Sequence, residues 1–590
     1  MDFDFFSILQ LVGGLAMFLF GMQVLGDGLT KASGGRMESI LEKLTSNPVK
    51  GVFLGMLVTA VIQSSSATTV MVVGFVNAGI MKLRQAVGVI MGANIGTTVT
   101  SWILSLVGLE SSNFFIQMLK PQSFSPILAI IGIFMVMLAK KEKFKNIGNI
   151  MVGFAVLMFG MDTMSNTVKP LADVPAFAEF LLMFENPFFG VFAGMLLTAI
   201  IQSSSASVGI LQALCSTGAV SYAVAVPIIM GQNIGTCITA ILSSIGASKN
   251  ARRAALVHLY FNLIGTTCFL FAFYILHAIM DFGFMSVAAN EIGIAVVHSC
   301  FNVFATLLLL PFSRMLEKLA CLTIKDNETQ NETEGERTFA ILDERFLEAP
   351  GLAVEQCRNA AADMASKAKE ALLLAQSLFD QYDEKILKQV MSTEDLLDRY
   401  EDELGSYLVK LSSRNLSEKD SHMLSILLHC IGDLERIGDH AVNLAHSAKE
   451  MYDKNLRFST GAENELSVFV RAVNEILETA VHSFEEQNEA AARSVEPLEE
   501  VIDQLNAELK DRHIIRLRRG ECTIEMGFIL ADVMNNYERI SDHCSNIAIC
   551  AIQENTDVDA HDYIVTLKAS DNREFLAAVD SYKQKYRLPC

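Results

Sequence analysis

Two short polar tetrads stand inside otherwise apolar sequence, and each offers a set of groups that could hold a small ion. The first tetrad is Gln63-Ser64-Ser65-Ser66, and the second is Gln202-Ser203-Ser204-Ser205. The Gln amide and the three hydroxyls of each tetrad can both donate and accept hydrogen bonds. Four consecutive polar residues are costly in lipid unless they line protein or water. The tetrads therefore indicate two candidate binding sites within membrane segments.

The tetrads belong to a longer duplication, in which residues 14–105 and 153–244 are copies of one segment, 139 positions apart. A second motif, Gly-x-Asn-Ile-Gly-Thr, begins 29 positions after the Gln of each tetrad. Duplicated apolar halves with polar, glycine-broken segments are typical of secondary transporters whose site lies between the repeats. The second motif could equally serve helix packing. Its polar residues join the candidate site: Asn94, Thr97, Asn233 and Thr236.

Composition divides the chain into a membrane part and a soluble part. The chain has 590 residues, of which 51% are hydrophobic, which is too apolar for an ordinary soluble protein. Residues 1–318 hold 17 basic and 14 acidic residues, a net charge of +3, whereas the remaining 29 basic and 52 acidic residues give −23. The acidic part argues against nucleic acid as a partner and is compatible with multivalent cations. Eleven scattered Cys without a CxxC pair indicate a reducing cytosol around the soluble part.

The basic residues predict the membrane topology. Seven apolar stretches are expected to cross, near 6–30, 85–108, 126–139, 147–166, 224–246, 254–279 and 288–311. The tetrad segments, about 36–80 and 176–220, could each be one span or a re-entrant pair of half-helices. Re-entry agrees best with the positive-inside rule, because it leaves only Lys120 and Lys169 outside. The inner loops then hold fifteen basic residues: Lys31, Arg36, Lys43, Lys50, Lys82, Arg84, Lys140, Lys141, Lys143, Lys145, Lys249, Arg252, Arg253, Arg314 and Lys318.

This topology places the N-terminus outside the cell membrane and the soluble part in the cytoplasm. Three complete spans separate equivalent points of the two copies, and an odd number gives the repeats opposite orientations. The tetrads would then enter from opposite faces and meet near the midplane, as alternating access requires.

The residues around the tetrads favour an anion accompanied by cations. Backbone amides at a half-helix N-terminus attract an anion. No Lys or Arg lies between Gly51 and Met81 or between Gly190 and Gly246, so these segments supply no fixed countercharge. Co-transported Na⁺ would balance the anion, and Ser and Thr hydroxyls are suitable ligands for a small cation. Thr68, Thr69 and Ser207 follow the tetrads closely and extend the candidate site.

The paired QSSS and GxNIGT motifs resemble those of the sodium/phosphate cotransporter family (type II), over roughly residues 10–310. The resemblance implies that Gln63–Ser66 and Gln202–Ser205 form sites for inorganic phosphate and sodium. The two copies differ just after the tetrads: Thr68 and Thr69 follow the first, but Ser207 and then Val208 follow the second. A hydroxyl that members of the family can supply there is absent, which bears on the number of sodium ions and on electrogenicity.

The acidic part is expected to be all-α and to contain a duplication of its own. A polar stretch that begins at Lys325 is typical of a linker, and apolar residues recur at helical spacing beyond it. Leu434–His440 parallels Tyr537–His543, 103 positions on. Glu394-x-x-x-Asp398 parallels Glu499-x-x-x-Asp503, 105 positions on. These parallels predict two three-helix units in tandem.

The acidic motifs of these units are compatible with metal binding. Carboxylates at i and i+4 share one helix face and repel each other. A cation held between neighbouring helices would offset the repulsion, but so would solvent, or pairing with Arg436 and Arg539. The Glu-Arg-Ile-x-Asp-His pattern resembles the PhoU family over about residues 345–555, which implies a metal cluster of unknown identity and a role in phosphate control. The residues carried over are Glu435, Asp439, Glu538, Asp542, Asp398 and Asp503.

Two further pairs in apolar sequence, His258-x-x-x-Asn262 and His298-x-x-x-Asn302, each place two polar groups on one helix face. Hydrogen bonding between helices is the favoured interpretation of these pairs.

The sequence therefore predicts an all-α protein. Residues 1–318 form a polytopic membrane domain with two inverted repeats and re-entrant hairpins, 319–344 a linker, 345–555 a cytosolic PhoU-like domain, and 556–590 a tail. The predicted function is sodium-coupled import of inorganic phosphate by alternating access. A carrier of another oxyanion or solute, and a membrane-tethered metal or phosphate sensor that does not transport, are the alternatives. An enzyme is not expected, because no P-loop, nucleophile elbow or Cys/His metal cluster is present.

Overall fold

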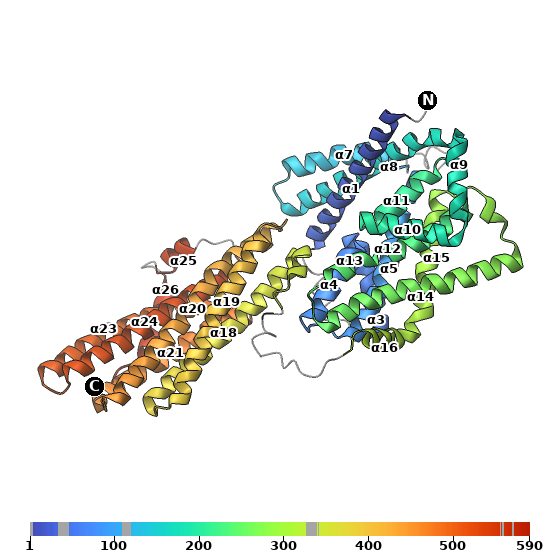
Figure 1. The fold of residues 1–590 in the computed structure, drawn as a ribbon. Helices are drawn as coiled ribbons and strands as arrows, with labels where there is room; N and C mark the ends of the chain where they lie inside the picture. The colour runs from blue at the N-terminus through green and yellow to red at the C-terminus, as the bar shows by residue number, and fades with distance from the viewer. Residues whose placement is uncertain are drawn as a thin grey trace. The chain divides into compact units, whose positions relative to one another are not determined.

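The computed structural model describes residues 4–33, 47–108, 120–325, 339, 341–554, 556, 560–568 and 572–589 (Figure 1). Within these ranges the chain is all-α, as predicted, and an isolated antiparallel bridge between Ser221 and Ala288 is the only β-type pairing. The chain divides into two compact units, Met1–Leu352 and Ala353–Cys590. Arg36, Lys43 and most of the predicted linker lie outside the described residues.

The first unit has six helices that are long and apolar enough to cross a membrane, and they coincide with six of the seven predicted spans. The protein is a multi-pass membrane protein. The remaining predicted span, 126–139, falls on α7 (Pro121–Leu138), whose apolar part is shorter. A further pair, α9 (Pro175–Leu182) with its 3₁₀ extension and α10 (Pro187–Ile201), passes the same test only when taken together and is bent by 103°. The six segments are Phe5–Ala32, Leu83–Ser105, Glu142–Leu171, Tyr222–Ser243, Lys249–Met280 and Glu291–Thr323.

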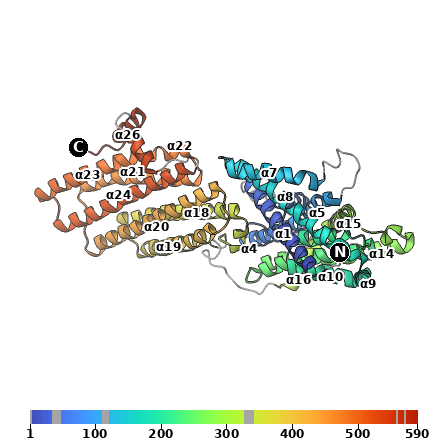
Figure 2. The same ribbon diagram turned by 90° about the horizontal axis from the view of Figure 1, so that it is seen from above.

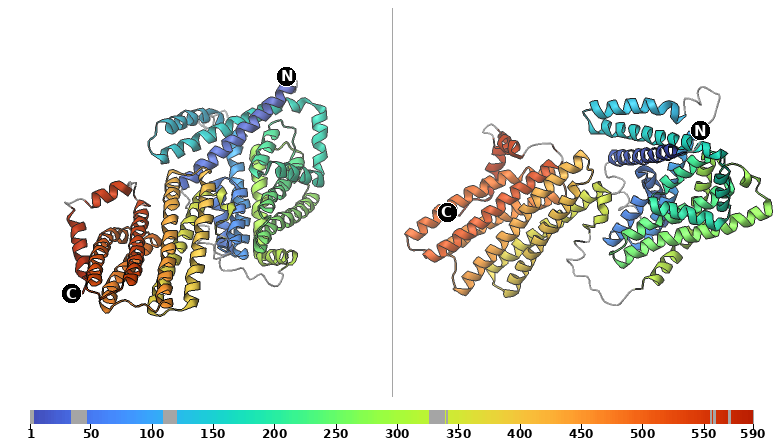
Figure 3. Two further views of the ribbon diagram at one scale, coloured as in Figure 1. Left: turned by 60° about the vertical axis from the view of Figure 1, so that its left-hand side comes forward. Right: turned by 45° about the horizontal axis from the view of Figure 1, so that its top comes forward.

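These segments contain α1 (Phe5–Ser33), α5 (Leu83–Ser105), α8 (Glu142–Val168), α12 (Tyr222–Gly235), α13 (Cys237–Ser243), α14 (Lys249–Met280), α15 (Glu291–Leu309) and α16 (Ser313–Thr323). Helices α7, α8 and α1 lie side by side as a layer (Figure 3). Short 3₁₀ turns connect several helices: Leu106–Gly108, Lys169–Asp173, Met183–Glu185, Gly283–Ser286 and Leu310–Phe312.

Each tetrad joins two short helices. The first lies between α3 (Pro48–Ile62) and α4 (Ser65–Asn77), and the second between α10 and α11 (Ser204–Cys215). Asn47 and Asn186 start α3 and α10, because each side-chain oxygen accepts a hydrogen bond from the amide two residues on, at 3.0 Å, and Pro follows at the first helical position. A helix of 15 residues is about 22 Å long, which is less than the ~30 Å hydrocarbon core of a bilayer. The re-entrant prediction requires such half-length helices.

Close backbone contacts fix each hairpin to the long helix that follows it. A Cβ on Gly55 would lie 2.1 Å from the Val89 carbonyl oxygen of α5, and a Cβ on Gly194 would lie 2.1 Å from the Ile228 carbonyl oxygen of α12. Any side chain would therefore push the helices apart. The repeated glycines thus serve close packing, and they hold α3 on α5 and α10 on α12 at matching points.

The first unit ends with a segment that packs on α4 and α13. It includes a 3₁₀ turn, Glu344–Glu348. Phe346 is fully buried, with its ring 5.4 Å from that of Phe75 in α4. Asn77 Nδ2 donates to Asp343 Oδ2 at 2.6 Å, and Arg345 Nε donates to the Ser243 carbonyl at the end of α13 at 2.6 Å. These contacts place residues 343–352 with the membrane helices, whereas the boundary at 345 stays a prediction.

The second unit consists of two sets of three long helices (Figure 2). The first set is α18 (Pro350–Asp380), α19 (Glu384–Ser412) and α20 (Glu418–Asp453), and the second is α21 (Thr460–Glu485), α23 (Val495–Arg518) and α24 (Ile524–Gln553). This confirms the predicted tandem arrangement. Short helices complete the unit: α22 (Glu489–Ala492), α25 (Ala560–Leu567) and α26 (Arg573–Lys585).

The two sets meet along α20 and α24. The His440 ring of α20 and the His543 ring of α24 stack there at 5.7 Å between centroids. The sequence motifs that repeat at 103 positions therefore face each other across the junction of the two sets.

Candidate functional site

Both tetrads begin with the same unusual backbone conformation. Gln63 and Gln202 each have φ 59° and ψ 21°, the left-handed region that residues other than glycine rarely adopt. Each Gln ends its helix by donating its backbone N–H to a Thr carbonyl four residues earlier, at 2.8 Å and 2.7 Å. Such conformations persist where the surrounding structure demands them, and they cluster at functional sites.

The second residue of each tetrad caps the next helix. Ser64 Oγ accepts a hydrogen bond from the Ala67 amide at 3.1 Å, and Ser203 Oγ accepts one from the Ala206 amide at 3.2 Å. Ser65 and Ser204 are the first helical residues and are buried. Amides in the first helical turn have no partner within the helix, so α4 and α11 each present free N–H groups beside serine hydroxyls. This arrangement suits an anion.

The two tetrads meet. Ser66 Oγ lies within hydrogen-bonding distance of the Gln202 carbonyl, 3.3 Å away, across 136 positions of sequence. Thr100 of α5 connects them a second time: its Oγ1 donates to Gln63 Oε1 at 2.9 Å and accepts from Ser205 Oγ at 3.4 Å. The structure thus brings residues of both predicted sites together around one point.

Thr100 was not among the predicted site residues. A signal for it exists in the sequence, because Thr100 and Thr239 stand 139 positions apart, each three residues after the Thr of GxNIGT. A lone Thr in a long apolar helix is otherwise indistinguishable from a packing residue.

The polar residues of GxNIGT bond to their own helices. Asn94 Nδ2 and Asn233 Nδ2 donate to the carbonyls of Ile90 and Ile229, at 2.9 Å and 3.0 Å. Thr97 Oγ1 and Thr236 Oγ1 likewise donate to carbonyls four residues earlier, each at 3.0 Å. All four residues are buried. In the described part of the chain none of their side-chain hydrogen bonds reaches a tetrad, which agrees with the helix-packing interpretation of this motif.

The residues after the tetrads differ between the repeats. In the first repeat, Thr59 Oγ1 donates to Thr68 Oγ1 at 3.0 Å, and Thr68 Oγ1 donates to the Ser64 carbonyl at 3.0 Å. Thr69 Oγ1 donates to the Ser65 carbonyl at 2.8 Å. The equivalent hydroxyls of the second repeat, on Thr198 and Ser207, are fully buried and have no hydrogen-bond partner among the described residues.

A third buried oxygen lies near this pair in the second repeat. Gln232 Nε2 donates to the Ser207 carbonyl at 3.0 Å, which orients the amide and leaves Gln232 Oε1 without a hydrogen-bond partner among the described residues. The equivalent position of the first repeat is Ala93. The second repeat therefore keeps polar oxygens that the first repeat either satisfies internally or lacks.

The second unit holds two carboxylate clusters. Glu394 and Asp398 of α19 meet Asp439 of α20, and Glu499 and Asp503 of α23 meet Asp542 of α24, with one oxygen from each residue of a cluster within 4.8 Å of the others. Four of the six predicted ligands lie in these clusters: Asp398, Asp439, Asp503 and Asp542.

The other two predicted ligands lie outside the clusters. Glu435 and Glu538 are next to Arg436 and Arg539, at 3.6 Å and 3.9 Å, while Glu394 and Glu499 complete the two groups. The same arginines also approach Asp439 and Asp542, at 3.5 Å and 3.4 Å. The arginines are more than half exposed, so this pairing offsets the cluster charge only weakly.

Burial and mutual repulsion raise the pKa values of these carboxyl groups. Burial, followed by the charge of Asp439, raises the pKa of Glu435 to about 7. Burial, followed by the charge of Glu496, raises the pKa of Glu499 to about 7, and burial, followed by the charge of Asp542, raises the pKa of Asp503 to about 6. Crowded carboxylate oxygens of this kind fit a hard divalent cation, whose charge would reverse these shifts.

A lysine distinguishes the second cluster from the first. Lys568 Nζ lies 3.2 Å from Glu499 Oε2 and 2.9 Å from the neighbouring Glu496 Oε1. The side chain therefore supplies a positive charge beside the position that a metal would take. The amine comes from the segment after α24, which the sequence motif does not include.

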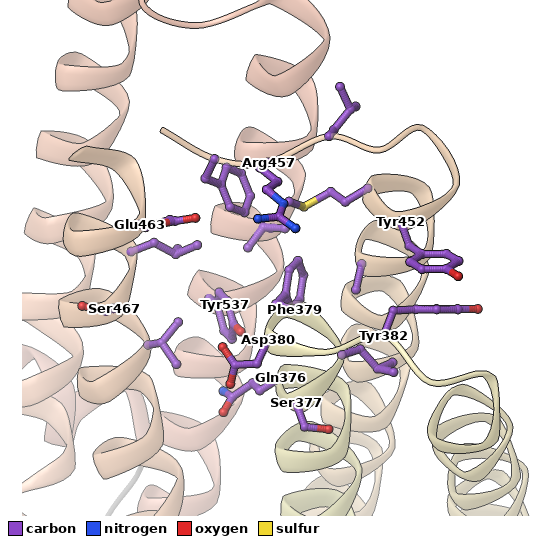
Figure 4. Close-up of a pocket in the computed structure, with 18 of the residues that line it drawn as sticks. Gln376, Ser377, Phe379, Asp380, Tyr382, Tyr452, Arg457, Glu463, Ser467 and Tyr537 are labelled. Carbon is purple, nitrogen blue, oxygen red and sulfur yellow. The ribbon is translucent and has the colours of Figure 1, made fainter. Parts of the chain in front are cut away.

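The second unit also contains a cavity of about 1070 Å³ at one end of the helix sets (Figure 4). Asp380 and Arg457 point into it, and Gln376 Nε2 donates to Asn474 Oδ1 at 2.7 Å in its wall. The Tyr382 and Tyr452 rings stack at its edge, 4.4 Å apart. None of the six carboxylates of the two clusters lines this cavity.

Comparison with known families agrees with this division. Residues 17–166 and 168–293 match the family described as Na⁺/Pi-cotransporter, one match for each repeat, and residues 361–448 and 467–551 match the PhoU domain, one match for each set of three helices. The chain joins a Na⁺/Pi-cotransporter unit to a PhoU unit. The two converging tetrads lie in the cotransporter unit, and the two carboxylate clusters lie in the PhoU unit.

Several relatives share one or both units. The putative inorganic phosphate export protein YjbB of Escherichia coli (strain K12) is 23% identical over 571 residues, which cover 94% of this chain and 99% of that protein. The uncharacterized protein YqeW of Bacillus subtilis (strain 168) is 28% identical over 313 residues, 52% of this chain and 96% of that protein. The sodium-dependent phosphate transport protein 2A of Rattus norvegicus is 37% identical over 99 residues, 16% of each chain.

Among solved structures, the crystal structure of PhoU from Pseudomonas aeruginosa matches with 21% identity, covering 34% of this chain and 95% of that chain, with a TM-score of 0.32. The cotransporter unit and the relatives with phosphate-transport names support phosphate transport by this chain.

Proposed function

We propose that this protein is a sodium-coupled symporter of inorganic phosphate, in which the anion binds where the two tetrads meet. The observation that carries the proposal is the double contact between the repeats, from Ser66 to the Gln202 carbonyl and from Gln63 through Thr100 to Ser205. A site built from both repeats opens to one side or the other when the repeats move against each other.

The chemistry of the site supports an anion that travels with cations. Serine hydroxyls and the free amides of α4 and α11 are donors for phosphate oxygens. No Lys or Arg lies between Gly51 and Met81 or between Gly190 and Gly246, so a phosphate buried between the tetrads needs mobile positive charge. Buried oxygens of the second repeat, including Ser207 Oγ, are suitable ligands for Na⁺. Thr68 and Thr69 complete the proposed substrate and sodium set, and Asn94, Thr97, Asn233 and Thr236 are proposed to support it from the helices that pack against the hairpins.

The PhoU unit is proposed to be a cytosolic regulator that binds a divalent metal at the two carboxylate clusters. The raised pKa values of Glu499 and Asp503 support this role, because they reflect burial and, after it, repulsion from neighbouring carboxylates that Lys568 offsets only in part. With this unit inside, the N-terminus lies outside, as the distribution of Lys and Arg favours.

The proposed direction is import, driven by an inward sodium gradient. The name of the Escherichia coli relative favours export as the second candidate. A symporter is reversible, so the sodium gradient and the phosphate gradient together set the direction of net flux.

Uptake of radiolabelled phosphate into proteoliposomes tests the proposal. We expect accumulation that requires sodium outside the vesicles and stops when the sodium gradient is collapsed. Preloaded vesicles with the gradient reversed should lose phosphate at a comparable rate. Phosphate flux that does not depend on sodium in either arrangement would contradict sodium coupling. The absence of any phosphate flux would favour the sensor interpretation. Competition by sulfate as strong as competition by phosphate would favour another oxyanion.

A further inference from the structure

Helices α14 and α15 carry the same motif, His-x-x-Phe-Asn-x-x-x-Thr, 40 positions apart. Its polar residues are spaced by four and therefore lie on one face of each helix. All six are at most 3% exposed, although they belong to membrane-spanning helices. They are His258, Asn262 and Thr266 in α14, and His298, Asn302 and Thr306 in α15.

The two copies contact different helices. In α14, Asn262 Nδ2 donates to Cys237 Sγ of α13 at 3.3 Å, and His258 Nδ1 has no hydrogen-bond partner among the described residues. In α15, His298 Nδ1 forms a hydrogen bond of 2.8 Å with Ser101 Oγ of α5. Only the α15 histidine therefore bonds through its ring to a helix of the first repeat, within the described part of the chain.

Ser101 is held from several sides. Besides His298, Gln212 Nε2 of α11 donates to the Ser101 carbonyl at 3.1 Å and to the Glu291 carbonyl of α15 at 2.9 Å. The next residue, Trp102, donates from its indole to Ser299 Oγ at 2.9 Å. This last turn of α5 is therefore fixed to α15 by side-chain bonds from two successive residues.

The residue before Ser101 is Thr100, which connects the two tetrads. Successive residues of a helix point about 100° apart, so the rotation of α5 that directs Ser101 toward His298 also directs Thr100 toward Gln63 and Ser205. A buried hydrogen bond helps to fix such a rotation, because a lost partner leaves a buried polar group unsatisfied.

We propose that His298 is a positioning residue for the tetrad site: through Ser101 it sets the rotation of α5 that holds Thr100 between the two tetrads. This inference rests on the proposed function, since it assigns His298 to the phosphate site. His258, at the equivalent place in α14, does not share this role.

Two substitutions separate the hydrogen bond from the volume of the ring. The amide of Asn reaches the position of the imidazole Nδ1, and the amide of Gln reaches that of Nε2. His298→Asn therefore retains the bond to Ser101, whereas His298→Gln loses it. Ser101→Ala removes the other partner. The same pair of substitutions at His258 is the matched control.

The full-length chain is assayed in proteoliposomes for uptake of radiolabelled phosphate as a function of phosphate concentration. His298→Gln and Ser101→Ala are each expected to raise the half-saturating phosphate concentration about tenfold, the effect of one lost buried hydrogen bond, with a smaller change in maximal rate. The double variant should be no worse than either single variant. His298→Asn and both His258 variants should stay within about threefold of wild type.

Equal impairment by Asn and Gln at 298 would show that ring volume matters rather than the bond, and it would overturn the proposal. So would wild-type kinetics in both variants.

Hydrogen–deuterium exchange of the peptide that spans residues 63–69, measured on the detergent-solubilised chain, provides a readout that does not depend on transport. His298→Gln and Ser101→Ala should speed exchange there, and His298→Asn and His258→Gln should not. If wild type failed to transport but this pattern appeared, the proposed function would fall while the positioning of the tetrads would stand. Unchanged exchange in every variant would overturn the positioning role itself.

Discussion

The two repeats of the cotransporter unit have the same backbone conformation at their tetrads, but the hydrogen bonds of their side chains differ. Gln63 and Gln202 have the same dihedral angles, yet Gln63 is buried and bonded to Thr100, whereas Gln202 is exposed. Thr59 and Thr68 bond to each other in the first repeat, whereas the hydroxyls of their counterparts Thr198 and Ser207 have no hydrogen-bond partner in the part of the chain that the structure describes. The repeated sequence thus reproduces the hairpin, and a few unmatched side chains make the halves chemically unequal.

The same lesson holds in the PhoU unit. Its two clusters repeat one arrangement of Glu, Asp and Asp, but Lys568 approaches only the second, among the described residues. In both units the two copies keep the same helix arrangement. The function proposed for each copy depends on side chains that differ between the copies.

The largest effect is expected where the repeats are alike. Ser65→Ala and Ser204→Ala each remove a buried hydroxyl at a helix start, and each should lower phosphate uptake at least about tenfold, because a hydrogen bond to a charged ligand is lost. Membrane insertion should be unaffected. Ser286→Ala, at an exposed turn, is the control. Near-normal uptake in both tetrad variants would remove the tetrads from the mechanism.

The second prediction concerns the two carboxylate clusters. If the second cluster binds a cation as proposed, Lys568 competes with that cation, and Lys568→Ala should strengthen Mn²⁺ binding there by about tenfold. Isothermal titration of the purified chain with Mn²⁺ measures this effect. Asp439→Asn, which damages the first cluster, is the comparison variant and should leave the second cluster unchanged. Identical titrations of wild type and Lys568→Ala would mean that the lysine does not occupy the ion's place.

A smaller effect should follow from making the second repeat resemble the first. Ser207→Thr supplies the methyl-bearing hydroxyl of Thr68, which can bond to Thr198 as Thr68 bonds to Thr59. If these oxygens serve sodium, the sodium concentration for half-maximal uptake should rise about threefold. Ala93→Gln, which adds the missing amide to the first repeat, is the reciprocal variant. Unchanged sodium dependence in Ser207→Thr would place the sodium ligands elsewhere.

The smallest effect is a dependence of stability on pH. The folded pKa values of Glu435 and Asp503, about 7 and about 6, are above their ordinary values of 4.5 and 3.8, so the metal-free folded state binds more protons than the unfolded state between about pH 4 and pH 7. Stability should therefore fall as pH rises through this window. We expect the Tm of the PhoU unit in the metal-free chain to drop by about 3 °C between pH 5 and pH 8.

Calorimetry of the chain with and without Mn²⁺ measures this slope. Metal should reverse it, because ionised carboxylates bind the cation, and Glu435→Gln should flatten it. A metal-free Tm that rises with pH would contradict the assigned pKa shifts.

Much of this architecture was predictable because the signals are local. Apolar length predicted seven spans, six of which coincide with helices long and apolar enough to cross a membrane, and the tetrads stand out as polar runs in apolar sequence. Thr100 was not predicted, because its role depends on how α5 is rotated relative to the two hairpins. The periodicity of the sequence does not specify that rotation. Likewise, spacing placed Glu435 and Asp439 on one face of α20, but the rotation of α19 brings Glu394 to Asp439 instead. Lys568 lies outside the repeated motif altogether.

The segment that packs on α4 and α13 shortens the connection between the two units. Because Phe346 is inserted against Phe75 and Asp343 is bonded to Asn77, only residues 347–349 separate this anchor from the start of α18. Displacing α4, which begins in the first tetrad, must either drag the first turn of α18 along or extract a phenyl ring whose burial is worth about 1.5–3 kcal/mol.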